Sequence, residues 1–426
     1  MKLRANIQHL LTSELTKNSA KLLSANVVAQ AIGLLVYPLL TRLYTPDDFG
    51  LLNLFLSIGN ICLLISTGEY QYAIVLPKKK KDAIACFHVG FLILVGVTLL
   101  CGISTLFSKQ IAALFNAPAL EGVYPLLCIF VFFSGLWIML NYWYTRNKRY
   151  TKISVYQITQ TISTACLKLG FGNIGWLSHG LIYSSVLGPI VGLVVNISAH
   201  YKRDIRPLLT FDWQRCREMS ICYSNFPKFS LPRSIINTVS SNLPVLLLTP
   251  VFGLKDIGHF GMALTLSFAP ISIISKSLYQ VLYQQTTSLV QQKQKIQPLF
   301  MHYIRIILCA TIPCFITLYF ILPTLTEWLL GTNWSITGEY IRLLLPWLFF
   351  SAIVVPLGPL TDIFMKQKWW LYFEIITITL RFIAIIIGIG TNSIITAVIG
   401  YSLASALGLV IQLPWYFRLI SNYEKT

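Results

Sequence analysis

Charged residues are scarce in this sequence, and acidic residues are the scarcest of them. Asp, Glu, Lys and Arg make up 11% of the 426 residues, with 15 acidic against 33 basic side chains. A soluble chain of this length needs far more charge to cover its surface. Hydrophobic residues account for 55% and the mean hydropathy is +0.67. This composition excludes an ordinary soluble domain and predicts a polytopic membrane protein.

Other common features are also missing. The nine cysteines are odd in number and scattered, and the six histidines show no ligand spacing, so we expect no disulfide framework, no metal site and no cofactor. The first residues, MKLRANIQHLLTSELTKN, lack the apolar core and cleavage site of a signal peptide. They predict a short amphipathic helix at the membrane surface, with Leu10, Leu11 and Leu15 on one side.

What the chain does have is a series of apolar stretches. Each is roughly 20 residues long, which matches a hydrocarbon core of about 30 Å. None shows the period-two alternation of a barrel strand, so the class is all-α. The twelve predicted spans are 20–41, 49–68, 84–107, 122–145, 153–172, 174–198, 230–252, 257–282, 300–323, 340–362, 369–389 and 392–417.

The basic residues between these spans fall mostly on one side. With the N-terminus inside, the inner loops hold 23 Lys and Arg, whereas the outer loops hold only Arg42, Lys109 and Lys255. The positive-inside rule then predicts that both termini face the cytoplasm. The basic loops lack the aromatic interleaving of nucleic-acid-binding modules, so no nucleic-acid partner is expected.

The two halves of the chain resemble each other. RLYTPDDFGLL at 42–52 aligns without gaps on PVFGLKDIGHF at 250–260, which places Asp48 on Asp256. An even number of spans in each half predicts two parallel six-helix repeats. The predicted organisation is a first bundle at 1–198, a basic cytoplasmic linker at 199–229 and a second bundle at 230–426.

The aligned turn also has a local interpretation. Pro46 is expected to end the first helix, because proline interrupts the helical hydrogen-bond ladder. Asp47 or Asp48 is expected to cap the next helix by accepting backbone N–H bonds. We expect this turn to be structural.

Nine of the charged side chains that fall within or at the ends of predicted spans are candidate site residues. Charges in hydrocarbon cost about 2.5–3.5 kcal/mol on insertion scales and usually face a cavity or a partner. Six are cationic and three acidic: Lys21, Lys168, Arg233, Lys276, Arg305 and Arg381, and Glu69, Asp362 and Glu374.

These charges have two interpretations. Long cationic side chains near helix ends can reach the interface, and Arg381 can pair with Glu374 two turns earlier. Alternatively, the cations line a basic cavity for a phosphorylated amphiphile, to which Arg and Lys bind through charge-assisted hydrogen bonds. The three acids are candidates for ion or proton coupling, because an acid in apolar surroundings can cycle a proton.

One stretch carries a family pattern. PLLTRLYTPDDFGLLNLF, beginning at Pro38, is followed by EYQYAIVLPKKKKDA. It resembles the bacterial polysaccharide flippase family, the O-antigen and capsular repeat-unit translocases of the multidrug/oligosaccharidyl-lipid/polysaccharide exporter superfamily. The Thr-Arg-x-Tyr-x-Pro-x-Asp-Phe-Gly turn is present, and Tyr70 and AIVLP match a second element. Glu69 stands where that element usually has Arg, and Gln71 stands where it usually has Glu.

The resemblance implies a V-shaped transporter of two six-helix bundles around a central cavity. Helices 1, 2, 7 and 8 would line it, which favours Lys21, Glu69, Arg233 and Lys276 as cavity residues. The implied activity is transfer of an undecaprenyl-pyrophosphate-linked oligosaccharide across the bacterial inner membrane by alternating access, for O-antigen or capsule synthesis. The implied partners are this lipid, the bilayer and other membrane proteins of polysaccharide assembly.

Two other functions are alternatives to a flippase. A cation-coupled drug or small-molecule antiporter of the same superfamily would favour an acidic cavity, whereas the nine candidate charges are six basic to three acidic. A membrane polysaccharide polymerase usually has a sizeable outer loop, whereas even the longest predicted outer connection, 324–339, is short. The loops show no paired carboxylates, nucleophile–base set or glycine-rich phosphate loop, so we expect no enzyme activity.

Overall fold

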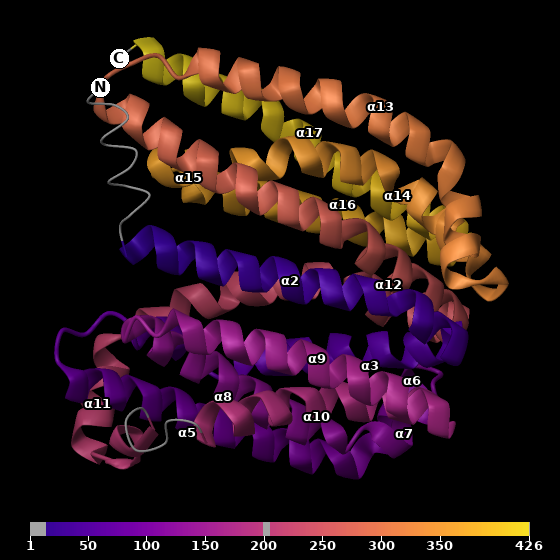
Figure 1. The fold of residues 1–426 in the computed structure, drawn as a ribbon, viewed down its shortest axis with the longest axis horizontal. Helices are drawn as coiled ribbons and strands as arrows, with labels where there is room; N and C mark the ends of the chain where they lie inside the picture. Colours follow the sequence, from indigo (N-terminus) through magenta and orange to yellow (C-terminus); the bar gives the residue numbers. More distant parts are fainter. Residues whose placement is uncertain (1–13, 199–204, 426) are drawn as a thin grey trace. The chain divides into compact units, whose positions relative to one another are not determined.

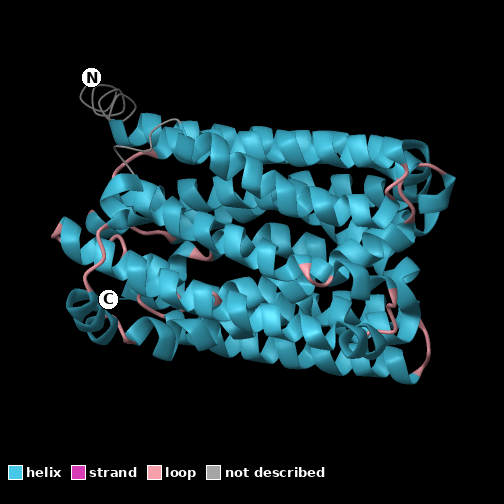
Figure 2. Cartoon of the chain, turned by 90° about the horizontal axis from the view of Figure 1, so that it is seen from below, coloured by secondary structure: helices cyan, strands magenta, loops and turns pink. Residues whose placement is uncertain are grey.

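The structure is a computed structural model that describes residues 14–198 and 205–425. Helices joined by short turns make up these residues, and no strand occurs among them (Figures 1 and 2). The chain divides into two compact units, Met1–Val239 and Ser240–Thr426. In this division the described part of 199–229 belongs to the first unit.

The first unit contains six long helices, and α12 begins within it. The long helices are α2 (Glu14–Leu43), α3 (Pro46–Ile65), α5 (Lys80–Ser104), α8 (Leu126–Arg146), α9 (Tyr150–Ile174) and α10 (Leu177–Ser198). The short helical segments are α4 (Tyr70–Ala73), η1 (Thr105–Phe107), α6 (Ser108–Leu114), α7 (Ala119–Val123), η3 (Arg206–Leu209), α11 (Trp213–Cys222) and η4 (Phe226–Ser230). Helix α9 packs against both α2 and α10.

The second unit begins within α12 (Leu231–Gln291), whose backbone is not helical at Gly253. It continues with α13 (Gln297–Leu330), η5 (Thr332–Trp334), α14 (Ser335–Val354), η6 (Val355–Leu357), α15 (Pro359–Ile363), α16 (Gln367–Gly390) and α17 (Ile394–Lys425). If the two sides of the α12 break count separately, each half of the described chain contributes six segments of membrane-spanning length. The all-α polytopic prediction is confirmed.

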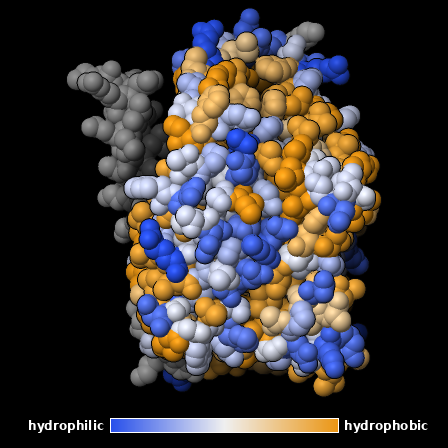
Figure 3. All heavy atoms as spheres, turned by 90° about the vertical axis from the view of Figure 1, so that its right-hand side faces the viewer, coloured by the Kyte–Doolittle hydropathy of each residue, from blue (hydrophilic) through white to orange (hydrophobic). Residues whose placement is uncertain are grey.

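Apolar side chains cover the outside of these helices as well as the inside. Leu35 and Phe320 are 75% and 73% exposed, which suits a surface that faces lipid. Figure 3 views the helices from one end, where hydrophilic residues (blue) and hydrophobic residues (orange) both reach the surface. Ten helices of the described chain are long and apolar enough to cross a membrane. Helix α12 counts once among them, and α9 is missing because it carries many polar residues.

The turn between α2 and α3 forms a capping box. Thr45 is the N-cap, and its hydroxyl accepts a hydrogen bond from the Asp48 N–H. The Asp48 carboxylate in turn accepts the Thr45 N–H at 2.8 Å. The expectation that Asp48 accepts a backbone N–H is therefore confirmed. The expectation that Pro46 ends the first helix was wrong, because α2 ends at Leu43 and Pro46 is the first residue of α3. At the first position of a helix the backbone N–H has no partner within the helix, so proline is tolerated there.

The break in α12 falls at the position that the internal alignment assigns to this turn. Thr45 lies opposite Gly253 in that alignment, and each is followed three residues later by an aspartate. Thr45 has an extended backbone, whereas Gly253 has φ 81° and ψ 175°, a conformation open to glycine. The first two long helical segments are therefore separated by a capped turn in the first half and by a non-helical glycine in the second.

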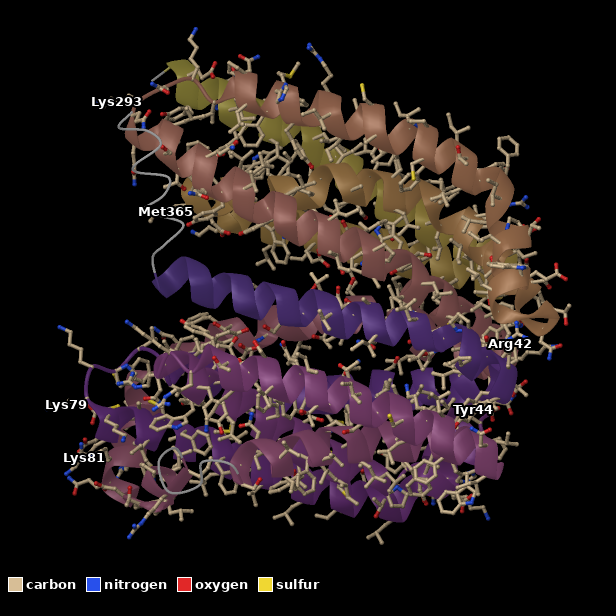
Figure 4. All side chains as sticks on the ribbon, in the orientation of Figure 1. Arg42, Tyr44, Lys79, Lys81, Lys293 and Met365 are labelled. Carbon is tan, nitrogen blue, oxygen red and sulfur yellow. The ribbon has the colours of Figure 1, made fainter. Side chains whose placement is uncertain are left out.

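One further sequence expectation needs revision. The outer connection expected at 324–339 is largely helical, because α13 continues to Leu330 and α14 begins at Ser335. The N-terminal amphipathic segment lies mostly outside the described residues. Within the first unit, Lys79 and Lys81 lie at one end of the helices and Arg42 at the other (Figure 4).

Candidate functional site

Glu69 is an ionisable residue of the first unit that is both buried and held in an unusual backbone conformation. It lies between α3 and α4 and is 1% exposed. Its backbone has φ 63°, in the left-handed region that side chains other than glycine rarely adopt. Such a conformation costs on the order of 1–3 kcal/mol and persists only where the surrounding structure holds it. The strain and the burial together mark this position as a functional candidate.

The start of α12 supplies the partners of Glu69. The Ser234 hydroxyl donates a hydrogen bond to the carboxylate, and the Arg233 guanidinium acts on it through its charge. Burial raises the pKa of the Glu69 carboxyl above its ordinary value, and these two partners oppose that rise. The Oε2 atom of Glu69 is buried and has no hydrogen-bond partner among the described residues. Arg233 itself is exposed.

The remainder of the family-like segment is held by polar contacts. The Thr67 hydroxyl donates to the Gln71 side-chain oxygen at 2.5 Å, so the amide at the unusual position 71 has a partner. Arg146, at the end of α8, donates to the carbonyl oxygens of Ile74 and Val75 at 3.2 and 3.1 Å. Arg146, one of the basic residues of the predicted inner loops, therefore also fixes the chain between α4 and α5.

Aromatic rings surround this region. The Tyr72 ring lies 5.1 Å from that of Tyr142 and 6.2 Å from that of Phe226, measured between centroids. Tyr142 also interacts electrostatically with Glu69. We call Glu69, Arg233, Ser234, Tyr72, Tyr142 and Phe226 the Glu69 cluster. It combines an exposed guanidinium, a buried acid and apolar rings, so it can bind an anion and exchange a proton.

In the second unit, Arg381 contacts three other helices. Its Nε donates to the Ser405 hydroxyl at 2.8 Å, and a terminal nitrogen donates to the Ser240 hydroxyl at 3.0 Å. The guanidinium lies 5.2 Å from the centre of the Tyr401 ring and 5.9 Å from that of Trp347. It makes no direct ion pair with Glu374 among the described residues, although Glu374 feels its charge.

The other predicted residues are dispersed. Asp362 is exposed and accepts a hydrogen bond from the Tyr279 hydroxyl at 2.9 Å. Arg305 is exposed on α13, and Lys168 is half-buried on α9, where its backbone carbonyl accepts the Tyr44 hydroxyl at 2.6 Å. Lys21 and Lys276 lie in α2 and α12, but their side chains are outside the described residues.

Two features were missed in the sequence. Arg342, about two turns into α14, pairs with Glu339 and lies 5.4 Å from the centre of the Tyr319 ring. Helix α9 carries Gln157, Gln160, Thr164 and Lys168 at intervals of three or four residues, which places them on one face. The spacing of this polar stripe was visible in the sequence and could have identified it.

Comparisons with known proteins agree on the fold. A family model described as "Polysaccharide biosynthesis protein" matches residues 39–340. The lipid II flippase MurJ, in an inward closed conformation, is 14% identical with a TM-score of 0.71, over 94% of this chain and 89% of that chain. An inward-facing multidrug resistance MATE family transporter of the MOP superfamily is 13% identical with a TM-score of 0.65, over 95% and 96%.

A MOP superfamily transporter from Pyrococcus furiosus, described by the reverse polarity of its binding pocket, is also similar. It is 13% identical with a TM-score of 0.57, over 96% of this chain and 95% of that chain. No curated protein sequence matches the chain. At these identities the solved structures establish a shared fold, that of transporters and flippases.

Proposed function

The chain belongs to the polysaccharide biosynthesis protein family, and from this premise we propose that it is a flippase for a lipid-linked oligosaccharide. Its substrate would be an undecaprenyl-pyrophosphate-linked repeat unit, moved from the inner to the outer leaflet of a bacterial inner membrane for O-antigen or capsule synthesis. The step is alternating access. It forms and breaks no covalent bond, so the chain acts as a transporter and not as a polymerase.

The observation that carries this proposal is the exposed Arg233 guanidinium beside the buried Glu69. A guanidinium presents five donors in a fork that matches phosphate oxygens, and it stays charged at any working pH. The hydrogen bonds between Arg and phosphate are charge-assisted and roughly twice as strong as neutral ones. Arg233 can therefore hold the pyrophosphate, while the apolar outside of the helices accommodates the prenyl tail.

Glu69 gives the same cluster a candidate coupling group. Its carboxyl favours the protonated form because it is buried, and the charge of Arg233 favours the ionised form. An anionic pyrophosphate at Arg233 would neutralise that charge and favour protonation of Glu69. Substrate binding and proton uptake would then be linked at one site.

The test is transport of a polyprenyl-pyrophosphate oligosaccharide by the protein reconstituted into vesicles. Arg233→Ala should lower the rate by about ten-fold, the scale expected when a hydrogen bond to a charged group is lost. Arg217→Ala, which removes an exposed guanidinium from α11, is the matched control and should transport normally. Wild-type protein that moves no such lipid would overturn the function, and a normal Arg233→Ala rate would overturn the site.

A further inference from the structure

The first unit contains a pocket that shares no residue with the Glu69 cluster. It measures about 340 Å³, is partly open to the surface of the unit, and is lined by residues of α3, α8, α9 and α10. Helix α10 packs against α3, α8 and α9, so the cavity belongs to the bundle itself (Figure 1). Small-molecule sites generally begin at about 300 Å³, so there is room for a compact chemical group.

The polar stripe of α9 supplies one wall of this cavity. Gln160 and Thr164 line it, together with Tyr156 from the same helix. Gly188 of α10 lies against Thr164, where a side chain would collide with its hydroxyl. The glycine therefore lets α10 pack tightly behind the stripe. A polar wall inside a membrane bundle requires partners for its hydrogen-bonding groups.

Those partners are missing in the described part of the chain. Tyr156 is 1% exposed, and its hydroxyl makes no hydrogen bond to any described residue. The same holds for the side chains of Gln160 and Thr164, and for the Trp137 N–H on the α8 side of the cavity. One turn along the stripe, the Gln157 side-chain oxygen is buried and unpartnered. Tyr156 is buried, whereas Trp137, Gln160 and Thr164 are half-buried around the pocket. Their unpaired donors and acceptors are groups that a ligand in the pocket can satisfy.

The chemistry of the lining specifies the class of ligand. Its polar groups are hydroxyls, an amide and an indole N–H, and no described residue that lines it is charged. The Trp137 and Tyr156 rings stack with centroids 3.3 Å apart and give the cavity an aromatic wall. Neutral donors and acceptors beside an aromatic surface suit a molecule with hydroxyl groups on its edges and C–H bonds on its faces. A phosphate or a cationic drug would instead need an opposite charge.

We propose that this cavity binds a neutral sugar ring of the translocated glycan. The inference rests on the proposed flippase function and adds a glycan subsite separate from the phosphate-binding Arg233. The sugar hydroxyls pair with Tyr156, Gln160 and Thr164, and a ring face lies against Trp137. The lipid pyrophosphate alone gains nothing from this cavity.

The experiment compares two lipids on purified full-length protein by native mass spectrometry. One probe is the lipid-linked oligosaccharide fraction extracted from cells that encode the chain, and the other is undecaprenyl pyrophosphate without sugar. The variants are Tyr156→Phe and Thr164→Val, which remove hydrogen-bonding groups but keep the volume. The matched controls are Tyr183→Phe on α10 and Thr161→Val on α9, neither of which lines the cavity.

The combined cavity variant should bind the sugar-bearing lipid at least ten-fold more weakly and the sugar-free lipid with unchanged affinity. Arg233→Ala should weaken both, and the control variants should weaken neither. Equal binding by wild type and cavity variant, or equal losses for both lipids, would overturn the glycan subsite while leaving the flippase standing. Wild-type protein that binds neither lipid would overturn the proposed function and this inference with it.

Discussion

At the scale of single residues, Glu69 shows how burial and charge compete at one carboxyl. Burial raises its pKa, and Ser234 and Arg233 only oppose that rise. The folded state therefore binds the proton more tightly than the unfolded chain, whose Glu titrates near pH 4.3. Stability from this group is complete below that pH and is lost as the pH rises through the higher folded pKa.

Glu69→Gln should remove this dependence. We expect the variant to unfold at an equal or higher temperature than wild type on the alkaline side, because no carboxylate then has to be buried. The measurement is thermal unfolding in detergent as a function of pH. Glu121→Gln replaces an exposed carboxyl in the same unit and should leave the profile unchanged. A Glu69→Gln profile that parallels wild type would contradict the assignment.

Arg381 is held by two hydroxyls and two rings, and each contact depends on the planar guanidinium. Arg381→Lys keeps the charge but loses the fork and most of the stacking, so it should lower the free energy of unfolding by about 1–3 kcal/mol. Thermal unfolding in detergent measures this loss. Arg305→Lys on α13, exposed and without such partners among the described residues, is the control and should unfold like wild type. If Arg381→Lys is equally stable but binds the lipid substrate less well, Arg381 serves the substrate and not the bundle.

At the scale of elements, the break in α12 depends on Gly253. Its φ of 81° with ψ of 175° is open only to glycine, and a Cβ there would meet no atom within 4 Å. Gly253→Ala should therefore destabilise through backbone strain alone, by about 1–3 kcal/mol. Gly96→Ala, in the middle of α5 and also in open space, should instead stabilise by about 0.5–1 kcal/mol. Thermal unfolding of Gly253→Ala and Gly96→Ala measures both changes in stability. Equal changes in the two variants would show that the backbone at Gly253 is not strained.

The sequence predicted the helices better than their ends and partners. Segments of about bilayer length matched the long helices, including α9, which is too polar to count by its apolar character alone. The N-cap role of Thr45 was missed because Asp47 and Asp48 are also suited to capping by residue type. Only the point at which α3 begins shows that Thr45 is the N-cap and that Asp48 is the third residue of the helix. The contacts of Arg381 were missed because Ser240 is 141 residues away in sequence. The predicted partner Glu374 lay on the same helix, where spacing alone suggests a contact.

The Glu69 cluster was also only partly predictable from the sequence. Its departure from the family pattern was visible at positions 69 and 71, but nothing in the spacing connected Glu69 to Arg233, more than 160 residues later. The cavity beside α9 could have been anticipated from its polar stripe, since polar residues at helical spacing in a membrane span require a polar environment. Its aromatic wall could not, because Trp137 comes from another helix.

At the scale of the whole molecule, the distribution of basic residues predicts the orientation in the membrane. The predicted inner loops carry 23 Lys and Arg and the outer loops carry 3, an asymmetry that favours cytoplasmic termini. A fluorescent protein fused after Thr426 should therefore fluoresce, since it folds in the cytoplasm. An epitope inserted beside Lys109 should be cleaved by protease added outside intact spheroplasts, and one beside Lys293 should be protected. The reverse pattern would invert the topology and place the Glu69 cluster at the outer face, where a cytoplasmically made lipid-linked sugar does not first meet the protein.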